Sequence, residues 1–241
     1  MSSTDSIYHY AHPFVCTDAA VFTLETRESG NYRKLPDTSL RILLYRRSSE
    51  PHENKWCLPG GFLDIDETPE DNIRRKILEK SHVSKCYLEQ LYTFCDVDRD
   101  PRARVISLSY LGLMNEDESR RFDHETTWFT IGYDASRKPV FQNGELSLTE
   151  SDFGFDHYSI ILTAMERLRS KIQYSHIIFN LLPAEFTLTQ LQYAYEAVLG
   201  KKGQAANFRR KIMDLVQGTD RYSRDKGHRP AELYTQRQEG T

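Results

Sequence analysis

The feature that most constrains the fold lies between residues 58 and 83, where a glycine pair precedes a helix start. Residues 59–61 (Pro-Gly-Gly) end a short apolar stretch and lead into a polar loop. Thr68 followed by Pro69 predicts the N-cap and the first position of a helix, because a threonine oxygen accepts an orphan backbone N–H and proline has no N–H to satisfy. Two acidic residues come next and suit the positive end of the helix dipole. The segment therefore predicts a loop and a helix that runs to about Lys80.

Residues 61–83 resemble the Nudix box, whose pattern is G-x5-E-x7-R-E-U-x-E-E-x-G-U, with U a bulky aliphatic residue. Six positions match that pattern: Gly61, Glu67, Arg75, Ile77, Glu79 and Val83. Three positions depart from it: Lys76 and Lys80 replace glutamates, and His82 replaces a glycine. The alternative is a similar loop and helix without chemical meaning, which the Pro-Gly-Gly lead and the strand-like segments on both sides disfavour.

The resemblance implies metal-dependent hydrolysis of nucleoside diphosphate derivatives, and the departures bear on that chemistry. Carboxylates one helical turn apart share a face and can hold hard cations, which activate water. Lys76 and Lys80, beside Arg75, bring positive charge to that face and should repel a cation. We therefore expect no catalytic residue, no bound metal and no cofactor. Because lysine can complement a phosphate as a point charge, we expect the pocket to bind a pyrophosphate-containing nucleotide without cleaving it.

The candidate effector-binding residues are charged or aromatic side chains on or near this segment. They are Arg46, Arg47, Trp56, Arg75, Lys76, Glu79, Lys80, Arg102 and Arg104. Guanidinium groups suit phosphates because they donate bidentate hydrogen bonds, and an indole face can stack on adenine. Solvated surface charge is the alternative for each arginine, and core packing is the alternative for Trp56.

Apolar patterning predicts a strand-rich domain around the box. The predicted strands lie at residues 14–25, 40–45, 88–96, 104–114 and 126–133. Residues 156–172 predict an amphipathic helix, because Ile161, Met165, Leu168 and Ile172 recur at helical spacing. The four cysteines form no C-x-x-C pair, which indicates isolated, reduced thiols.

Charge is distributed unevenly along the chain. The whole chain carries a net charge of −3, yet residues 201–237 hold ten Lys or Arg against four Asp or Glu, a net +6. Residues 1–200 hold 22 basic residues against 30 acidic ones, a net −8. An acidic body with a basic C-terminal end predicts a polyanionic partner for that end.

The basic end has the pattern of a winged helix-turn-helix. A helix is expected at residues 187–199 with Gly200 as its C-cap, a basic helix at 204–217, and a hairpin within 222–234. The second helix of such a motif enters the major groove of DNA. The candidate DNA-binding residues are Lys201, Lys202, Gln204, Asn207, Arg209, Arg210, Lys211, Lys226, His228 and Arg229. The alternative is a solvated basic face on a small helical bundle.

The combination resembles the Nudix-related transcriptional regulators of the NrtR type. Similarity to that family's DNA-binding domain lies in residues 179–192, 195–200, 207–211 and 227–234, and residues 102–107 fit its effector domain. The resemblance implies an α+β protein: a Nudix-like α/β/α sandwich with a mixed sheet, followed by a C-terminal winged helix-turn-helix domain. It also implies a repressor of NAD metabolism genes. Such a repressor is a homodimer on a palindromic double-stranded DNA operator, with ADP-ribose or a related NAD derivative as effector.

We expect four segments along the chain. These are an N-terminal arm (1–12), an effector-binding domain (13–150), a Nudix C-terminal helix with a linker (151–178) and the DNA-binding domain (179–241). A signal peptide and a membrane-length apolar run are absent from the sequence, which predicts a cytoplasmic protein without a membrane partner. Two other classes remain open: a working metal-dependent hydrolase of ADP-ribose-type nucleotides, and a protein-binding adaptor.

Overall fold

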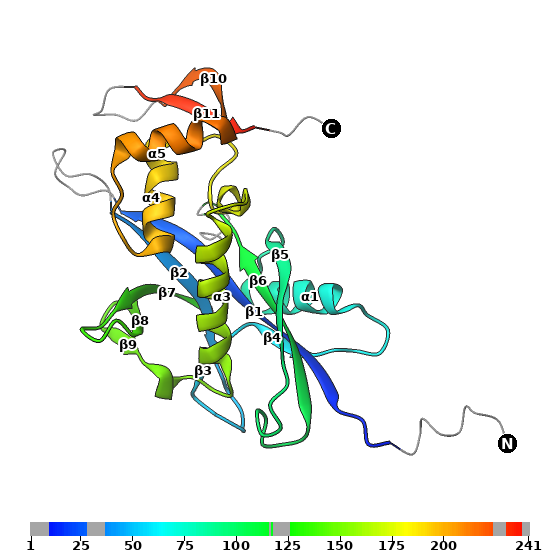
Figure 1. Ribbon diagram of the computed structural model, residues 1–241. Coiled ribbons are helices and arrows are strands. Elements are labelled where there is room, and N and C mark those ends of the chain that lie inside the picture. Colours follow the sequence, from blue (N-terminus) through cyan, green and yellow to red (C-terminus); the bar gives the residue numbers. More distant parts are fainter. Residues whose placement is uncertain (1–9, 28–36, 116, 118–125, 224–229, 238–241) are drawn as a thin grey trace.

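The computed structural model describes residues 10–27, 37–115, 117, 126–223 and 230–237 (Figure 1). Its strands are β1 (Phe14–Arg27), β2 (Asp37–Arg46), β3 (Trp56–Cys57), β4 (Gly60–Phe62), β5 (Tyr87–Phe94), β6 (Val105–Leu113), β7 (Thr126–Tyr133), β8 (Pro139–Asn143), β9 (Leu146–Leu148), β10 (Val216–Tyr222) and β11 (Glu232–Gln236). Its α-helices are α1 (Pro69–Ser81), α3 (His157–Lys171), α4 (Leu188–Leu199) and α5 (Ala205–Ile212). Short 3-10 turns are η2 (Glu150–Asp152), η3 (Ile177–Leu181) and η4 (Met213–Leu215).

The large sheet is mixed, as the sequence predicts. Its strands lie in the order β5-β6-β1-β2-β7-β8-β9, with β3 paired to β2 and β4 paired to β1. Strands β1 and β6 run parallel, whereas β1 is antiparallel to β2 and to β4. The pairing of β4 with β1 brings the Pro-Gly-Gly segment against the middle of the sheet.

Helices cover both faces of this sheet, and the alternation of apolar residues along β1 explains why. Val21 belongs to the cluster that packs Ile73 of α1, whereas its neighbour Phe22 belongs to the cluster that packs Ile161 of α3. Successive strand residues point to opposite faces, so both faces of β1 are buried. The α/β/α sandwich predicted from the sequence is confirmed.

Helix α1 begins where the sequence predicts. The Thr68 hydroxyl oxygen accepts the Asp71 N–H at 3.2 Å, and Pro69 is the first helical residue. At the other end His82 adopts the left-handed conformation with φ of 55°, and its N–H donates to the Leu78 carbonyl at 2.8 Å. The residue that replaces the Nudix glycine thus occupies a backbone position that favours glycine.

Helices α4 and α5, together with the two strands that follow them, form the winged helix-turn-helix that the sequence predicts. The Thr187 hydroxyl oxygen accepts the Gln190 N–H at 3.1 Å, and Gly200 ends the helix with a φ of 67°. Strands β10 and β11 form the antiparallel hairpin, although its first strand begins six residues before the predicted hairpin at residue 222.

The predicted helix at residues 204–217 is wrong in its last third. Helix α5 ends at Ile212, and β10 begins at Val216. Leu215 continues the helical apolar spacing, which explains the prediction. The β-branched Val216 instead pairs with Gln236 of β11, and this tertiary pairing overrides a weak local preference for helix.

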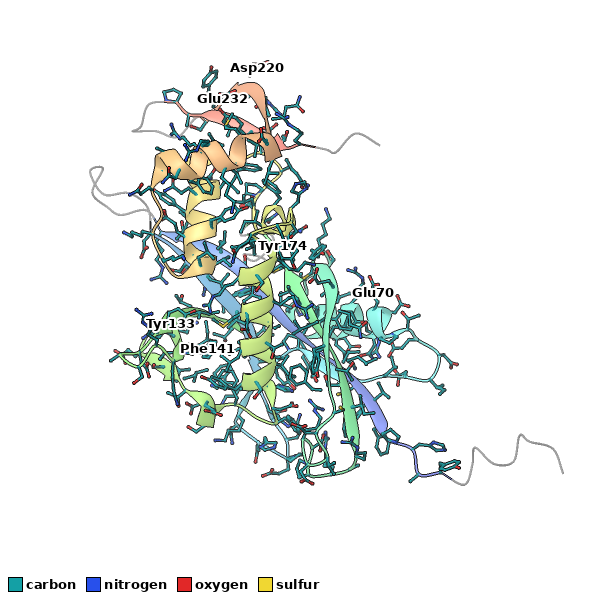
Figure 2. All side chains as sticks on the ribbon, in the orientation of Figure 1. Glu70, Tyr133, Phe141, Tyr174, Asp220 and Glu232 are labelled. Carbon is teal, nitrogen blue, oxygen red and sulfur yellow. The ribbon has the colours of Figure 1, made fainter. Side chains whose placement is uncertain are left out.

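One apolar core joins the sheet to the C-terminal helices. The same buried cluster contains Phe22 of the sheet, Ile161 of α3, Leu191 of α4 and Ile212 of α5. Phe141, labelled in Figure 2, is fully buried in this cluster and lies 6.2 Å from the ring of Tyr158 in α3. Because α3 and α4 pack in one cluster, a displacement of α3 would also displace α4. In the part of the chain that the structure describes, no helix is long and apolar enough to cross a membrane.

Candidate functional site

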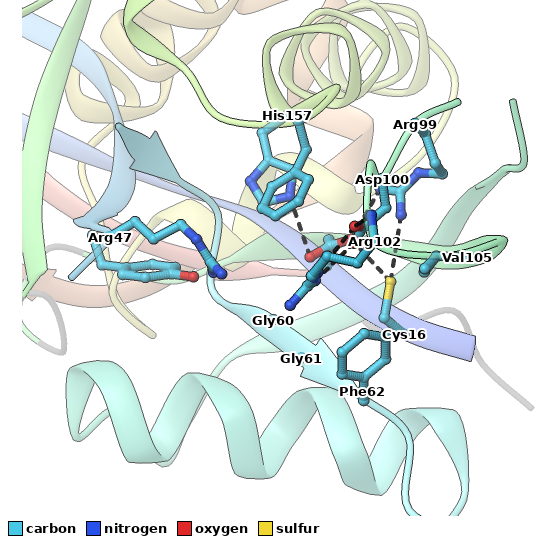
Figure 3. A pocket seen from close by; sticks show the side chains of 13 residues that line it. Cys16, Arg47, Gly60, Gly61, Phe62, Arg99, Asp100, Arg102, Val105 and His157 are labelled. Atoms are coloured by element: carbon cyan, nitrogen blue, oxygen red, sulfur yellow. Dashed lines mark hydrogen bonds and ion pairs between the residues drawn. The ribbon is translucent and has the colours of Figure 1, made fainter. Parts of the chain in front are cut away.

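A cavity of about 180 Å³ lies where β1, β4, the turn before β6 and the start of α3 meet (Figure 3). It is lined by Cys16, Asp18, Tyr45, Arg47, Gly60, Gly61, Phe62, Arg99, Asp100, Arg102, Val105, Phe155 and His157. Gly60 is required here because a Cβ at that position would collide with the Asp18 carboxylate and with the Thr17 carbonyl. The Pro-Gly-Gly segment thus forms part of the wall of the cavity.

At the inner wall of the cavity a buried arginine pairs with two carboxylates. The Arg99 guanidinium makes two hydrogen bonds to the Asp156 carboxylate, at 2.7 and 2.8 Å. It also lies 3.6 Å from the carboxylate of Asp18, which accepts a 2.6 Å hydrogen bond from the Ser107 hydroxyl. Both carboxylates belong to segments that flank the cavity, so Arg99 ties the turn before β6 to β1 and to the start of α3.

His157 is a buried polar group at the first position of α3. Its Nδ1 accepts the Leu58 N–H at 2.9 Å, so the proton of the neutral ring resides on Nε2. Nε2 lies 3.5 Å from an Asp18 carboxylate oxygen. Burial lowers the pKa of His157, which favours this neutral form. The ring therefore fixes the Leu58–Gly61 segment to α3.

Arginine and phenylalanine side chains alternate around the mouth of the cavity. The Arg102 guanidinium lies 5.3 Å from the ring centre of Phe62 and 5.6 Å from that of Phe155. The Arg47 guanidinium lies 5.1 Å from the ring centre of Phe155. Asp100 accepts hydrogen bonds from Arg102 at 3.0 and 2.7 Å, which orients that guanidinium at the mouth. The mouth thus offers flat apolar rings beside positive charge.

The carboxylates of the Nudix-like helix are paired within the chain. Arg75 lies 2.6 Å from Glu67, 2.8 Å from Glu79 and 2.9 Å from Asp64. The hydrogen bond from Arg75 lowers the pKa of Glu67 to about 2. Lys76 lies 3.2 Å from Glu79 on the same helix.

These paired carboxylates do not fit a divalent cation. A hard cation needs free oxygen ligands, and the oxygens of Glu67 and Glu79 are engaged by Arg75 and Lys76. Among the described residues no group of three or more His, Cys, Asp or Glu side chains could hold a metal ion. The absence of a bound metal at this site stays a prediction.

The structure separates the candidate effector residues into three groups. Arg47 and Arg102 line the cavity. Arg75, Lys76 and Glu79 form the network on α1, and the Lys80 ammonium lies 4.0 Å from the ring centre of Tyr45, itself a lining residue.

The other three candidates lie away from the cavity. Trp56 packs edge-on against Phe129 with ring centres 4.7 Å apart, as its core-packing alternative expects. Arg46 and Trp56 border a separate hollow near Asp152, and Arg104 donates to the Asp96 carbonyl at 2.8 Å. None of these positions tests ligand binding, so all nine assignments stay predictions.

Of the lining residues, only Arg47 and Arg102 were effector candidates in the sequence analysis. Those that it missed include Asp18, Phe62, Arg99, Asp100, Phe155 and His157. One signal was present: Asp18 is a carboxylate inside the apolar strand at residues 14–25, and a charge in such a strand is buried only when partners satisfy it. Its partner His157 lies 139 residues away and could not be matched to it without the fold.

The turn between α4 and α5 presents a basic, exposed surface. Phe208 turns toward the core, with its ring centre 5.3 Å from that of Tyr195, and Ile212 is buried. On the opposite side Asn207 donates to the Gln204 side chain at 3.1 Å, and Arg210 donates to Asn207 at 3.3 Å. These three side chains, spaced three residues apart, form one row along the exposed face of α5.

The exposed cations around this row complete the candidate nucleic-acid interface. Lys201, Lys202, Arg209 and Lys211 are all exposed. Lys226, His228 and Arg229 lie outside the residues that the structure describes. The hairpin is attached to the body through Phe186, which bridges to Tyr234 of β11.

The architecture defines a class of protein: a Nudix fold joined in one chain to a winged helix. Residues 34–134 match the NUDIX domain, and residues 178–235 match the NrtR DNA-binding winged helix domain. An ADPR responsive transcriptional repressor NtrR from Acinetobacter baylyi is 32% identical over 235 residues, which cover 93% of this chain and 82% of the relative. The chain belongs to the NrtR family of Nudix-related transcriptional regulators.

Two solved structures share the fold of this chain. The Shewanella oneidensis NrtR complexed with a 27mer DNA has a TM-score of 0.70 at 30% identity, covering 92% of this chain and 93% of that one. A MutT/nudix family protein from Enterococcus faecalis has a TM-score of 0.76 at 23% identity, covering 98% and 94%. The first supports the regulator class, and the second shows the fold alone.

Proposed function

We propose that this chain is a transcriptional repressor that binds an operator through α5 and its wing and releases it when ADP-ribose, or a related NAD derivative, occupies the cavity. The observation that carries the proposal is that one packed chain holds both a cavity with arginines and aromatic rings at its mouth and a basic winged helix. The relative from Acinetobacter baylyi, named as an ADPR responsive repressor, supports the choice of effector. We propose genes of NAD metabolism as its targets and the cytoplasm as its location.

The chemistry of the cavity suits part of a nucleotide diphosphate. Its volume of about 180 Å³ is below the roughly 300–1,000 Å³ of pockets that enclose a whole drug-sized ligand. One end of ADP-ribose enters, and the rest lies across the mouth. There Phe62 and Phe155 offer faces for a flat base, while Arg47 and Arg102 donate hydrogen bonds to phosphate oxygens.

The same site is poorly suited to hydrolysis. Glu67 and Glu79 are held by Arg75, and lysines occupy the positions of two further Nudix glutamates. The chain binds the nucleotide and turns it over slowly or not at all. A working ADP-ribose hydrolase is the competing function, since the sheet, the loop and two of the acidic residues of a Nudix enzyme are retained.

DNA recognition is proposed for the row on α5 and the lysines of the turn. A helix in the major groove reads bases with residues near its N-terminus, and glutamine, asparagine and arginine can make paired hydrogen bonds to base edges. A homodimer on a palindrome places two such helices one helical turn of DNA apart, roughly 34–36 Å. Effector binding then acts by favouring a geometry of the dimer that fits these grooves less well.

The test is an anisotropy titration of the full chain with labelled duplexes from the promoters near its own gene, with and without ADP-ribose. We expect salt-sensitive binding to one palindromic duplex and weaker binding with ADP-ribose by roughly 5- to 150-fold, the usual range of allosteric coupling. A scrambled duplex is the control. Rapid release of AMP with Mg²⁺ or Mn²⁺, without specific DNA binding, would establish the hydrolase instead. Absence of any salt dependence with DNA would indicate the adaptor.

A further inference from the structure

Near the C-terminal end of α3, one arginine makes a polar contact with the DNA-binding domain in addition to the apolar core that the two share. The Arg169 Nε donates a hydrogen bond to the Val198 carbonyl at 3.1 Å. Val198 lies in the last turn of α4, where backbone carbonyls lack helical partners and the helix dipole is negative. Arg169 therefore caps the C-terminus of a helix in the neighbouring domain.

Arg169 is partly buried, and its partners are a carbonyl and an aromatic ring. None of the ion pairs found in the described residues involves Arg169, and burial lowers the pKa of its guanidinium. Its charge is stabilised instead by the carbonyl of Val198 and by the ring of Tyr133, whose centre lies 5.5 Å away. A guanidinium that is partly desolvated and has no carboxylate partner depends strongly on the position of α4.

Tyr133 also lies beside the turn that carries the basic side chains. A side chain at Gly200 would meet the Tyr133 ring, because a Cβ there would lie 3.6 Å from it. The chain passes from Gly200 directly into Lys201 and Lys202. The Gly203 N–H then donates to the Glu196 side chain at 3.0 Å, which ties the turn back to α4. Tyr133, Arg169, Val198 and Gly200 therefore form one junction at the entrance to α5.

The opposite end of α3 forms part of the cavity. Phe155 and His157 line it, and Asp156 makes two hydrogen bonds to Arg99. His157 and Arg169 are twelve residues apart, about 18 Å along a rigid helix at 1.5 Å per residue. A ligand that moves Phe155 or Asp156 thus displaces a helix whose other end holds the start of the recognition turn.

We propose that Tyr133 and Arg169 are positioning residues that transmit occupancy of the cavity to the recognition helix. The proposal rests on the proposed function, since it needs an effector that changes DNA affinity. A ligand can shift an equilibrium only through contacts that differ between two states. A displacement of α3 moves Arg169, and it therefore changes both the hydrogen bond to Val198 and the contact with the ring of Tyr133 beside Gly200.

The experiment compares the ratio of DNA affinities with and without ADP-ribose in Arg169→Met, Tyr133→Leu and the wild type. Calorimetry measures ADP-ribose affinity in parallel. We expect the ratio to fall to less than about twofold, from a wild-type value of roughly 5- to 150-fold, while ADP-ribose affinity stays within about threefold. Arg169→Lys, which keeps a cation at the end of α4, should restore part of the ratio.

Arg167→Met is the matched control, because Arg167 lies on the same helix and donates to the Leu91 carbonyl of β5 at 3.1 Å. It should keep the wild-type ratio. Should Arg169→Met fail to fold, Tyr133→Leu still tests the inference. Tyr133 is 42% exposed, and we expect its replacement to leave the fold intact. A normal ratio in both junction variants, or an equal loss in Arg167→Met, overturns the inference. A wild type that ignores ADP-ribose overturns the proposed function itself.

Discussion

Nη2 of Arg75 lies 2.6 Å from Oε1 of Glu67, so the arginine of the Nudix-like helix pairs with the first acid of the Nudix pattern. The same guanidinium reaches Glu79, and Lys76 reaches Glu79 from the other side. The two carboxylates that remain from the Nudix pattern therefore form salt bridges with other side chains of this chain. Arg75 matches the Nudix pattern, so the departure that changes this face is Lys76, which pairs with Glu79 and brings positive charge to the position of a glutamate.

Restoring acids on that face should restore hydrolysis. Lys76→Glu/Lys80→Glu completes the four acids of the Nudix pattern, of which Glu67 precedes α1 and the other three lie on it, and the added carboxylates attract Mg²⁺. We expect ADP-ribose cleavage with Mg²⁺ to rise by roughly 10²-fold, the scale of one well-placed acid or base. The measurement is AMP release followed by chromatography. Lys76→Gln/Lys80→Gln removes the same charges without adding ligands and should stay inactive. Equal rates in both double variants would contradict the metal argument.

The left-handed His82 should cost the chain stability. A side chain at a φ of 55° crowds its own backbone, whereas glycine does not. We expect His82→Gly to raise the free energy of unfolding by about 1 kcal/mol. Denaturant titration measures it. His82→Ala keeps the crowding and removes the imidazole, so it should leave stability almost unchanged. A larger gain in the alanine variant would show that the imidazole itself is unfavourable.

Acid should weaken the network around Arg75 in a defined pH window. The pKa of Glu67 falls from its ordinary 4.5 to about 2, chiefly because Arg75 donates hydrogen bonds to it. A group with a depressed folded pKa contributes stability that is fully present above its unfolded pKa and is lost as pH falls through the folded pKa. We therefore expect the network to lose stability between about pH 4.5 and pH 2. Glu67→Gln should flatten that part of the stability curve in denaturant titrations at each pH. An unchanged slope would contradict the assignment.

Local patterns predicted the elements around the site, and the fold had to supply the rest. Thr68, Pro69 and Gly200 are local signals, and each marks the helix end that the sequence predicts. Asp18 and His157 are far apart in sequence, and only the pairing of β1 with β4 and the packing of α3 bring them to 3.5 Å. The short strands β3, β4, β8 and β9 were also missed, because two to five residues carry too little periodicity to identify.

The effector site can be tested with two arginines that the sequence does not distinguish. Arg102 lies at the mouth of the cavity, whereas Arg46 borders a separate hollow and donates to the Asn54 carbonyl. A hydrogen bond to a charged group is worth about 1.5–3 kcal/mol, so Arg102→Gln should weaken ADP-ribose binding by roughly 10- to 100-fold. Arg46→Gln should leave it unchanged. Calorimetry on both variants makes the comparison. Equal losses would place the phosphates outside this cavity.

The row on α5 and the lysines of the turn should contribute differently to DNA binding. Asn207 lies in the middle of the row, bonded to Gln204 and Arg210, so Asn207→Ala also loosens its two neighbours. A paired contact to a base is worth about 1–3 kcal/mol, and we expect Asn207→Ala to lower operator affinity by roughly 5- to 150-fold. Its binding to scrambled DNA should be almost unchanged. Lys201→Gln should instead weaken both duplexes alike and reduce the slope of log affinity against log salt by about 0.9. Anisotropy titrations of both variants on both duplexes, at several salt concentrations, separate the two effects. If Asn207→Ala also lowers the salt slope and weakens both duplexes equally, the row contacts phosphates and the bases are read by other residues.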